Sequence, residues 1–153
     1  MAWARPECGH DRHHVVLYCH GGGYTSGNLG YARVLASKLA KSTGYEVLSF
    51  EYRLAPEHPY PAALEDALAA WDYLMELGYG ARDVVLAGDS AGGNLALVLT
   101  QALKEMCIRD SSHGGTRGFL HGIPAFVQNA GIFDFSLFRT PILQREKRKL
   151  RTS

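Results

Sequence analysis

A serine in a short glycine-flanked segment is the clearest candidate for chemistry in this sequence. Residues 88–92 read Gly-Asp-Ser-Ala-Gly and match the pattern Gly-x-Ser-x-Gly, in which a tight turn exposes a serine hydroxyl between a strand and a helix. Small neighbours are needed there because the flanking chains approach closely. The first amides of the following helix favour negative charge beside the serine. We therefore predict that Ser90 is a nucleophile, held in an elbow by Gly88, Asp89 and Gly92.

Two plainer interpretations of this segment are an ordinary glycine-rich turn and a phosphate-binding loop. A dinucleotide-binding fingerprint is excluded because neither glycine cluster has the spacing Gly-x-Gly-x-x-Gly. The position between an apolar run at residues 84–87 and a helical pattern at 94–105 favours the nucleophile.

A second glycine cluster could stabilise the oxyanion of such a reaction. Residues 20–24 read His-Gly-Gly-Gly-Tyr, and successive glycines let backbone N–H groups turn toward one point. We predict an oxyanion hole from the amides of Gly21, Gly22, Gly23 and Ala91. His20 is expected to fix this loop by a hydrogen bond and not to act as the base. The alternative is a flexible glycine loop.

The elements that must position these residues alternate between strands and helices. Largely apolar runs without alternation at 15–19, 47–50 and 84–87 predict strands buried on both faces. Helices are predicted at 31–41, with Val34, Leu35 and Leu39 on its apolar face and Gly44 after its end, then from Pro61 to about 76, and at 94–105. This order predicts an α/β architecture with a parallel sheet between helices.

Three segments in this order and spacing resemble the hormone-sensitive-lipase family of α/β hydrolases, also called type IV bacterial esterases. They are residues 20–24, residues 52–63 (Tyr-Arg-Leu-Ala-Pro-Glu-His-Pro-Tyr-Pro-Ala-Ala) and residues 88–94. The resemblance covers roughly residues 14–105. It implies the central strands and helices of a three-layer α/β-hydrolase fold, incomplete in this chain.

The resemblance also implies a function. It is that of a serine carboxylesterase or lipase-type hydrolase that acts on small-molecule esters of short-to-medium acyl chains through an acyl-enzyme, without metal or organic cofactor. The segment 52–57 is a structural signature beside the active site in that family, so Arg53, Glu57 and Asp66 are interpreted as a polar packing network.

The acid and base of a catalytic triad are not identified. The candidate groups after Ser90 are Asp110, His113, His121 and Asp134, and their spacing makes solvated loop residues the simpler interpretation. Residues 122–127 and 133–135 also resemble the family's next strand and the aromatic-x-Asp loop after it, in which case Asp134 is structural. We therefore expect weak or no activity from this chain, and a non-catalytic module that binds a small ligand remains the alternative.

The amino-acid composition limits the classes of protein to which this chain could belong. The 153 residues are 46% hydrophobic and 20% charged, which is typical of a globular domain and excludes a disordered or fibrous protein. No run approaches about 18 apolar residues, so no membrane span is predicted, and the first residues lack a secretory h-region, which makes a cytoplasmic location the default. Cys8, Cys19 and Cys107 fit neither a disulfide framework nor a metal site.

The two ends of the chain differ from its centre. Residues 1–111 hold nine basic and thirteen acidic residues, whereas 112–153 hold seven and two. Residues 106–111 resemble a translated sequencing-library adapter, so our hypothesis is a partial hydrolase domain at 1–105 and a chimeric or read-through tail at 106–153. A nucleic-acid-binding tail at 145–151 is the disfavoured alternative, because no aromatic residues interleave with its basic ones. The oligomeric state is not predicted.

The start of the chain is short for this family, which has a cap segment and an antiparallel edge strand before the strand at 15–19. Residues 1–14 offer little chain for either element. His10, His13 and His14 are expected on the surface before that strand.

Overall fold

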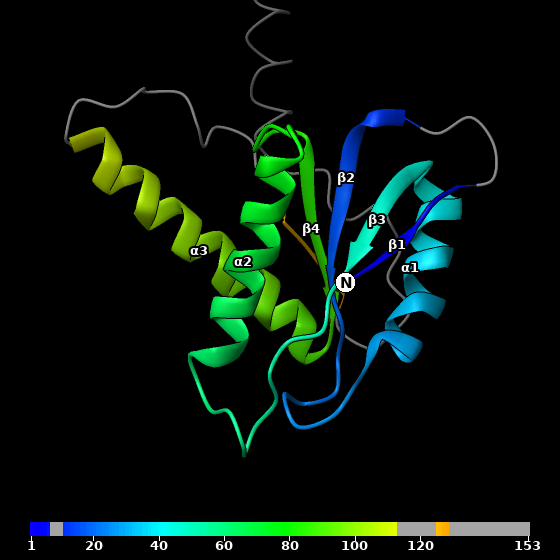
Figure 1. Cartoon of the computed structure of the whole chain (residues 1–153), viewed down its shortest axis with the longest axis horizontal. Helices are drawn as coiled ribbons and strands as arrows, with labels where there is room; N and C mark the ends of the chain where they lie inside the picture. Colours follow the sequence, from blue (N-terminus) through cyan, green and yellow to red (C-terminus); the bar gives the residue numbers. More distant parts are fainter. Residues whose placement is uncertain (7–10, 113–124, 129–153) are drawn as a thin grey trace, which may run out of the picture.

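The computed structural model describes residues 1–6, 11–112 and 125–128, with side chains at 1–6 and 13–106. Its elements are β1 (Ala2–Ala4), β2 (Asp11–Cys19), α1 (Leu29–Thr43), β3 (Tyr45–Ser49), α2 (Ala62–Glu76), β4 (Val84–Asp89), α3 (Ala91–Ser112) and β5 (Ala125–Gln128). The strands form one sheet in the order β1-β3-β2-β4-β5 (Figure 1). β2, β3, β4 and β5 run parallel, and β1 is antiparallel to β3.

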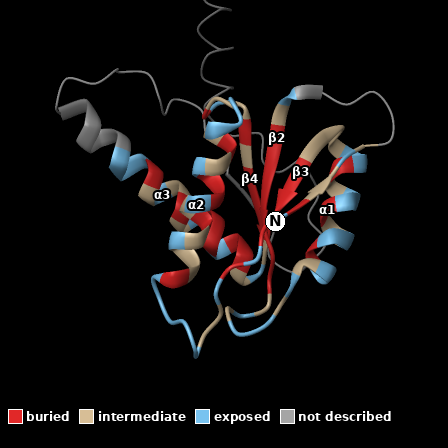
Figure 2. Ribbon diagram, viewed as in Figure 1, coloured by how far each residue is buried: buried red, intermediate tan, exposed pale blue. Residues whose placement is uncertain are grey.

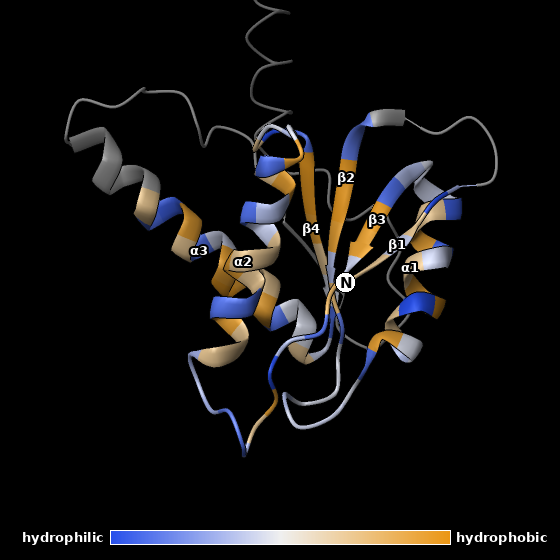
Figure 3. Cartoon of the chain, viewed as in Figure 1, coloured by the Kyte–Doolittle hydropathy of each residue, from blue (hydrophilic) through white to orange (hydrophobic). Residues whose placement is uncertain are grey.

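The sheet lies between helices, with α1 on one face and α2 and α3 on the other (Figure 1). Successive side chains of a strand point to opposite faces. In β2, Val15 and Leu17 therefore join the core under α2 and α3, whereas Val16 and Tyr18 pack with α1. Strands covered on both faces need apolar residues on both of them, which explains the largely apolar runs without alternation. Figure 2 shows these strand segments buried, and Figure 3 shows them strongly hydrophobic.

The N-terminal segment differs from the expectation. Residues 2–4 form the antiparallel edge strand β1, with Ala2 opposite Ser49 of β3. The next strand begins at Asp11, so His13 and His14 belong to β2 itself, and the His14 ring stacks on Tyr45 with centroids 5.2 Å apart. Residues 2–4 and 11–14 therefore belong to sheet strands that apolar patterning alone did not predict, because neither short segment contains a long apolar run.

The predicted apolar face of α1 is wrong at Val34, whose side chain is 58% exposed. The buried positions are Ala32, Ala36 and Ala40, four residues apart, and Leu35 and Leu39 pack at the margin of this cluster. Alanine lets a helix lie close to a sheet, so the smallest apolar residues form the contact stripe. Asn28 caps the helix by accepting from the Tyr31 N–H at 3.1 Å.

The observed ends of α1 and α2 agree with the end signals read from Gly44 and Pro61. Gly44 caps the C-terminus of α1 at φ 75°, and Pro61 immediately precedes α2. The helix α3 starts three residues before its predicted start and continues through 106–112. β5 supplies the strand expected within 122–127 and pairs with β4. The hypothesis of a foreign tail after residue 105 stays a prediction.

Candidate active site

Ser90 lies in a single-residue turn between the last residue of β4 and the first residue of α3. Its φ is 50°, a left-handed conformation that costs a non-glycine residue about 1–3 kcal/mol, and its side chain is exposed. A Cβ atom at Gly88 would collide with the Gly92 carbonyl, and one at Gly92 with the carbonyl oxygens of Cys19 and His20. The two glycines therefore permit both the turn and the close approach of the chain that follows β2.

The loop after β2 is held from within by His20. The imidazole is fully buried, and its Nδ1 lies 2.8 Å from the Gly21 carbonyl oxygen, to which it donates. The ring stacks on Tyr52 with centroids 4.3 Å apart, and the Tyr52 hydroxyl donates to the His20 carbonyl oxygen at 2.7 Å. These contacts agree with the expected loop-fixing role of His20.

Three consecutive residues of this loop have positive φ, namely Gly22, Gly23 and Tyr24 at 124°, 64° and 63°. The Gly22 carbonyl accepts from the backbone N–H groups of Thr25 and Ser26 at 3.1 and 2.9 Å. By contrast, the N–H groups of Gly22 and Gly23 have no hydrogen-bond partner within the described part of the chain. The same holds for the N–H of Ala91, which opens α3.

The prediction for Gly21 needs a correction. Its N–H donates to Oδ1 of Asp89 at 2.8 Å, so this amide is already used. A Cβ atom at Gly21 would also clash with Asp89, whose backbone oxygen would be 2.9 Å away. Gly21 therefore links the glycine loop to the elbow and does not offer its N–H to an oxyanion.

The Asp89 carboxylate accepts two further hydrogen bonds that the sequence patterns did not predict. The Tyr18 hydroxyl donates to Oδ1 at 2.5 Å, and the Tyr31 hydroxyl donates to Oδ2 at 3.0 Å. Burial, and then the bond to Asp89, raises the pKa of Tyr18, whereas the bond to Asp89 is the main cause that raises the pKa of Tyr31. Both phenols thus remain protonated donors at neutral pH. The available signal for Tyr18 was a tyrosine within the apolar run at residues 15–19.

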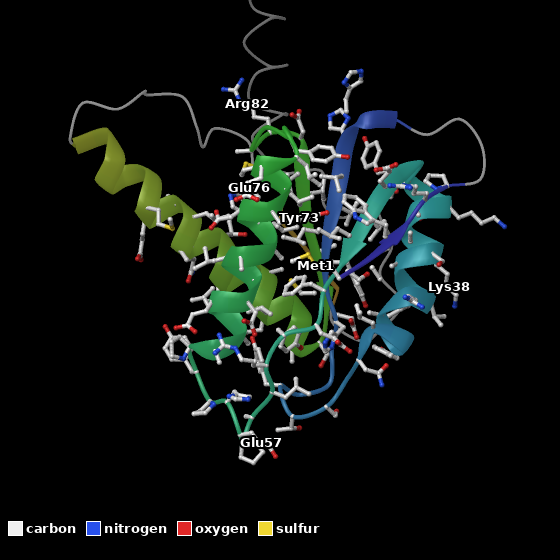
Figure 4. All side chains as sticks on the ribbon, in the orientation of Figure 1. Met1, Lys38, Glu57, Tyr73, Glu76 and Arg82 are labelled. Carbon is white, nitrogen blue, oxygen red and sulfur yellow. The ribbon has the colours of Figure 1, made fainter. Side chains whose placement is uncertain are left out.

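Arg53 forms the expected polar network with a different set of carboxylates. Its Nε contacts both Asp66 oxygens at 3.0 and 3.1 Å, its backbone N–H donates to Asp66 at 2.7 Å, and its Nη2 contacts Glu65 at 2.7 Å. These hydrogen bonds raise the pKa of Arg53. Glu57 is exposed at the tip of the loop before α2 (Figure 4) and is not among the carboxylates that contact Arg53, so its predicted participation is wrong.

A small, mostly apolar pocket of about 180 Å³ adjoins the first turns of α3. Its lining includes Tyr24, Ala63, Leu64, Asn94, Leu95 and Val98. The Tyr24 hydroxyl donates to Oδ1 of Asn94 at 2.8 Å, and the Asn94 N–H donates to the Ser90 carbonyl at 3.2 Å. One wall of the pocket therefore lies one helical turn from the candidate nucleophile.

A larger cleft of about 450 Å³ lies at the other end of the sheet. Its lining includes Glu46 at the start of β3 and Asp83 just before β4. Ser90 follows the opposite end of β4, so this cleft does not adjoin the candidate nucleophile.

The remaining candidate acids, bases and metal ligands add no catalytic group to this site in the described residues. Asp110 belongs to the last turns of α3, and His113, His121 and Asp134 lie outside the described residues, so no acid or base is assigned to Ser90. Within the described ranges, no group of three His, Cys, Asp or Glu residues could hold a metal ion, and no helix is long and apolar enough to cross a membrane. Burial raises the pKa of the Cys19 thiol to about 12, so it stays protonated.

Comparison with known proteins places this geometry among hydrolases. A family model described as alpha/beta hydrolase fold matches residues 16–124. The chain is 46% identical over 103 residues to an acetyl-hydrolase of Streptomyces hygroscopicus, covering 67% of this chain and 34% of that protein. It is 44% identical over 93 residues to an ethyl acetate hydrolase of Pseudomonas putida, covering 58% and 29%.

Solved structures of esterases and lipases are also similar to this chain. An esterase from the bacterial hormone-sensitive lipase family superposes with a TM-score of 0.67 at 36% identity, covering 82% of this chain and 38% of that one. A hormone-sensitive lipase from a metagenome library gives a TM-score of 0.58 at 43% identity, covering 62% and 33%. The chain thus spans about a third of the length of the proteins it matches.

Proposed function

Because this chain belongs to the hormone-sensitive-lipase family of α/β hydrolases, we propose that it carries the nucleophile and the oxyanion hole of a serine carboxylesterase. One observation carries the proposal: Ser90 is exposed in a strained turn between β4 and α3, beside a loop whose Gly22 and Gly23 N–H groups have no partner among the described residues. In this assignment Ser90 is the nucleophile, and Gly22, Gly23 and Ala91 donate to the oxyanion.

The reaction would proceed through an acyl-enzyme. The Ser90 Oγ attacks the ester carbonyl carbon while a general base takes the hydroxyl proton. The oxyanion of the tetrahedral intermediate is stabilised by backbone N–H groups, each of which contributes about 2.7–4 kcal/mol in a comparable site. The alcohol leaves with a proton, and water then hydrolyses the acyl-enzyme. No metal or organic cofactor takes part in this scheme.

The pocket beside α3 supports esters of small size as substrates. Its volume is about 180 Å³, and an apolar cavity of about 150 Å³ is large enough for benzene. The relatives named for acetyl and ethyl acetate hydrolysis also favour short chains. We therefore assign short-to-medium acyl esters as the substrate class.

A fluorophosphonate probe tests the proposal, because it reacts covalently with an activated serine. Because no base is assigned to Ser90 in the described residues, the expected result over a long incubation is slow formation of one modification, at Ser90 by peptide mapping, that is absent in Ser90→Ala and retained in Ser37→Ala, which changes an exposed serine of α1. A folded chain that binds a short ester without any labelling at Ser90 would instead be a non-catalytic binding module.

Turnover is a separate expectation. In subtilisin, loss of the catalytic histidine lowers kcat by about 2 × 10⁶. No base is assigned to Ser90 in the described part of this chain, so we expect weak or no hydrolysis of p-nitrophenyl butyrate. Rapid hydrolysis that Ser90→Ala abolishes would show that an acid and a base are present.

A further inference from the structure

The carboxylate of Asp89 joins three segments of the chain that are far apart in the sequence. It accepts the Gly21 N–H at 2.8 Å from the glycine loop, the Tyr18 hydroxyl from β2 and the Tyr31 hydroxyl from the first turn of α1. Its own backbone ends β4 and leads directly into Ser90. Hydrogen bonds to an ionised carboxylate are about twice as strong as bonds between neutral groups.

This arrangement restricts the direction of the next peptide groups. The Gly21 N–H is turned toward Asp89, and the Gly22 carbonyl is held by the turn at Thr25 and Ser26. The N–H groups of Gly22 and Gly23 are then left without partners in the described residues. A shift of the Gly21 peptide would rotate both groups, because the three residues are consecutive.

We propose that Asp89 is a positioning residue, whose carboxylate orients the glycine loop so that the Gly22 and Gly23 N–H groups serve the oxyanion. Tyr18 of β2 and Tyr31 of α1 hold the carboxylate in place by donating to its two oxygens. Asp89 itself touches no reacting atom. The inference rests on the proposed function, but the orientation of the loop can be measured without it.

Two variants separate the hydrogen-bond acceptor of Asp89 from its negative charge. Asp89→Ala removes the acceptor of the Gly21 N–H, whereas Asp89→Asn keeps an oxygen of similar position but removes the charge. Asp72→Asn makes the same chemical change at an exposed position of α2 and is the matched control. Circular dichroism establishes that each variant folds.

The first readout is the amide signals of the loop in ¹⁵N-labelled full chain. In Asp89→Ala, we expect hydrogen exchange of the Gly21 amide to accelerate at least about tenfold, since a charge-assisted bond is lost. The signals of Gly22 and Gly23 should move with it. Asp89→Asn should lie between wild type and Asp89→Ala, and Asp72→Asn should change none of these signals.

The second readout is the reaction of Ser90 with the fluorophosphonate, separated into probe affinity and the maximal labelling rate. Removal of one oxyanion donor costs about 10²–10³ in rate, so displaced donors should lower the maximal rate by about tenfold or more. The affinity should change little, and Asp89→Asn should recover part of the rate.

The outcomes distinguish this inference from the proposed function. A folded Asp89→Ala variant with wild-type Gly22 and Gly23 signals and a wild-type labelling rate overturns the inference. If wild type is not labelled, the proposed function fails, and the amide signals alone decide the role of Asp89. If Asp89→Ala does not fold, Asp89→Asn and Tyr31→Phe decide by the same criteria.

Discussion

The backbone of Gly92 lies so close to the carbonyl oxygen of Cys19 that no Cβ atom fits between them. Cys19 is the last residue of β2, and Gly92 is the second residue of α3. The glycine loop and the serine turn are therefore in direct backbone contact, and a change in one displaces the other.

Gly92→Ala should lower the free energy of unfolding by about 3 kcal/mol, because an added methyl group in a tightly packed site forces the backbone apart. Gly44→Ala is the control. Gly44 has open space around its Cα but a φ of 75°, so only backbone strain of about 1 kcal/mol is expected. Urea unfolding measures both values, and equal losses would contradict the close contact at Gly92.

The alanine stripe of α1 predicts that two substitutions on this helix differ in their effect on stability. Ala36 is 1% exposed against the sheet, so Ala36→Leu should overpack this contact and cost about 1–3 kcal/mol. Val34→Ala should change stability by less than about 0.5 kcal/mol, because Val34 is mostly exposed. Thermal unfolding compares them, and a larger loss for Val34→Ala would restore the face predicted from the sequence.

The two carboxylates that contact Arg53, those of Asp66 and Glu65, should differ in how much they stabilise the fold. Asp66 accepts from both the side chain and the backbone N–H of Arg53, whereas Glu65 contacts one terminal nitrogen and has a more exposed side chain. We expect Asp66→Asn to lower Tm more than Glu65→Gln does. Exposed ion pairs are weak and screened by salt, so 1 M NaCl should remove most of the Glu65 effect. Equal effects at low salt would contradict this ranking.

The buried Tyr18 should make the fold sensitive to alkaline pH. Its folded pKa lies above the ordinary value of 10.0, chiefly through burial and then through Asp89. This contribution to stability is fully present below about pH 10 and is lost as the pH rises through the folded value. The free energy of unfolding should thus fall above pH 10.

Tyr18→Phe tests that dependence, because it removes the ionisable group from the same site. We expect a shallower fall in the free energy of unfolding between pH 10 and 11.5 than in wild type. Tyr60→Phe, at a position that is 82% exposed, should keep the wild-type slope. An unchanged slope in Tyr18→Phe would mean that other groups control the alkaline transition.

Much of the framework could be predicted from short stretches of sequence. The largely apolar runs indicated β2, β3 and β4, Gly44 marked the end of α1, and the Gly-x-Ser-x-Gly segment indicated a turn at Ser90 between a strand and a helix. These features depend on neighbouring residues, because buried strands need apolar side chains and only certain residues tolerate positive φ. A local pattern is sufficient for such predictions.

Tertiary structure alone decided which residues that are distant in the sequence contact each other. Asp89 and Gly21 are 68 residues apart, and their hydrogen bond exists because β2 and β4 are adjacent parallel strands in a fixed register. The choice of Glu65 over Glu57 likewise depends on tertiary structure, because the first turn of α2 brings Glu65 to Arg53 whereas Glu57 stays in the loop before that helix. Sequence spacing carries no information on such pairs until the strand order and register bring the segments together.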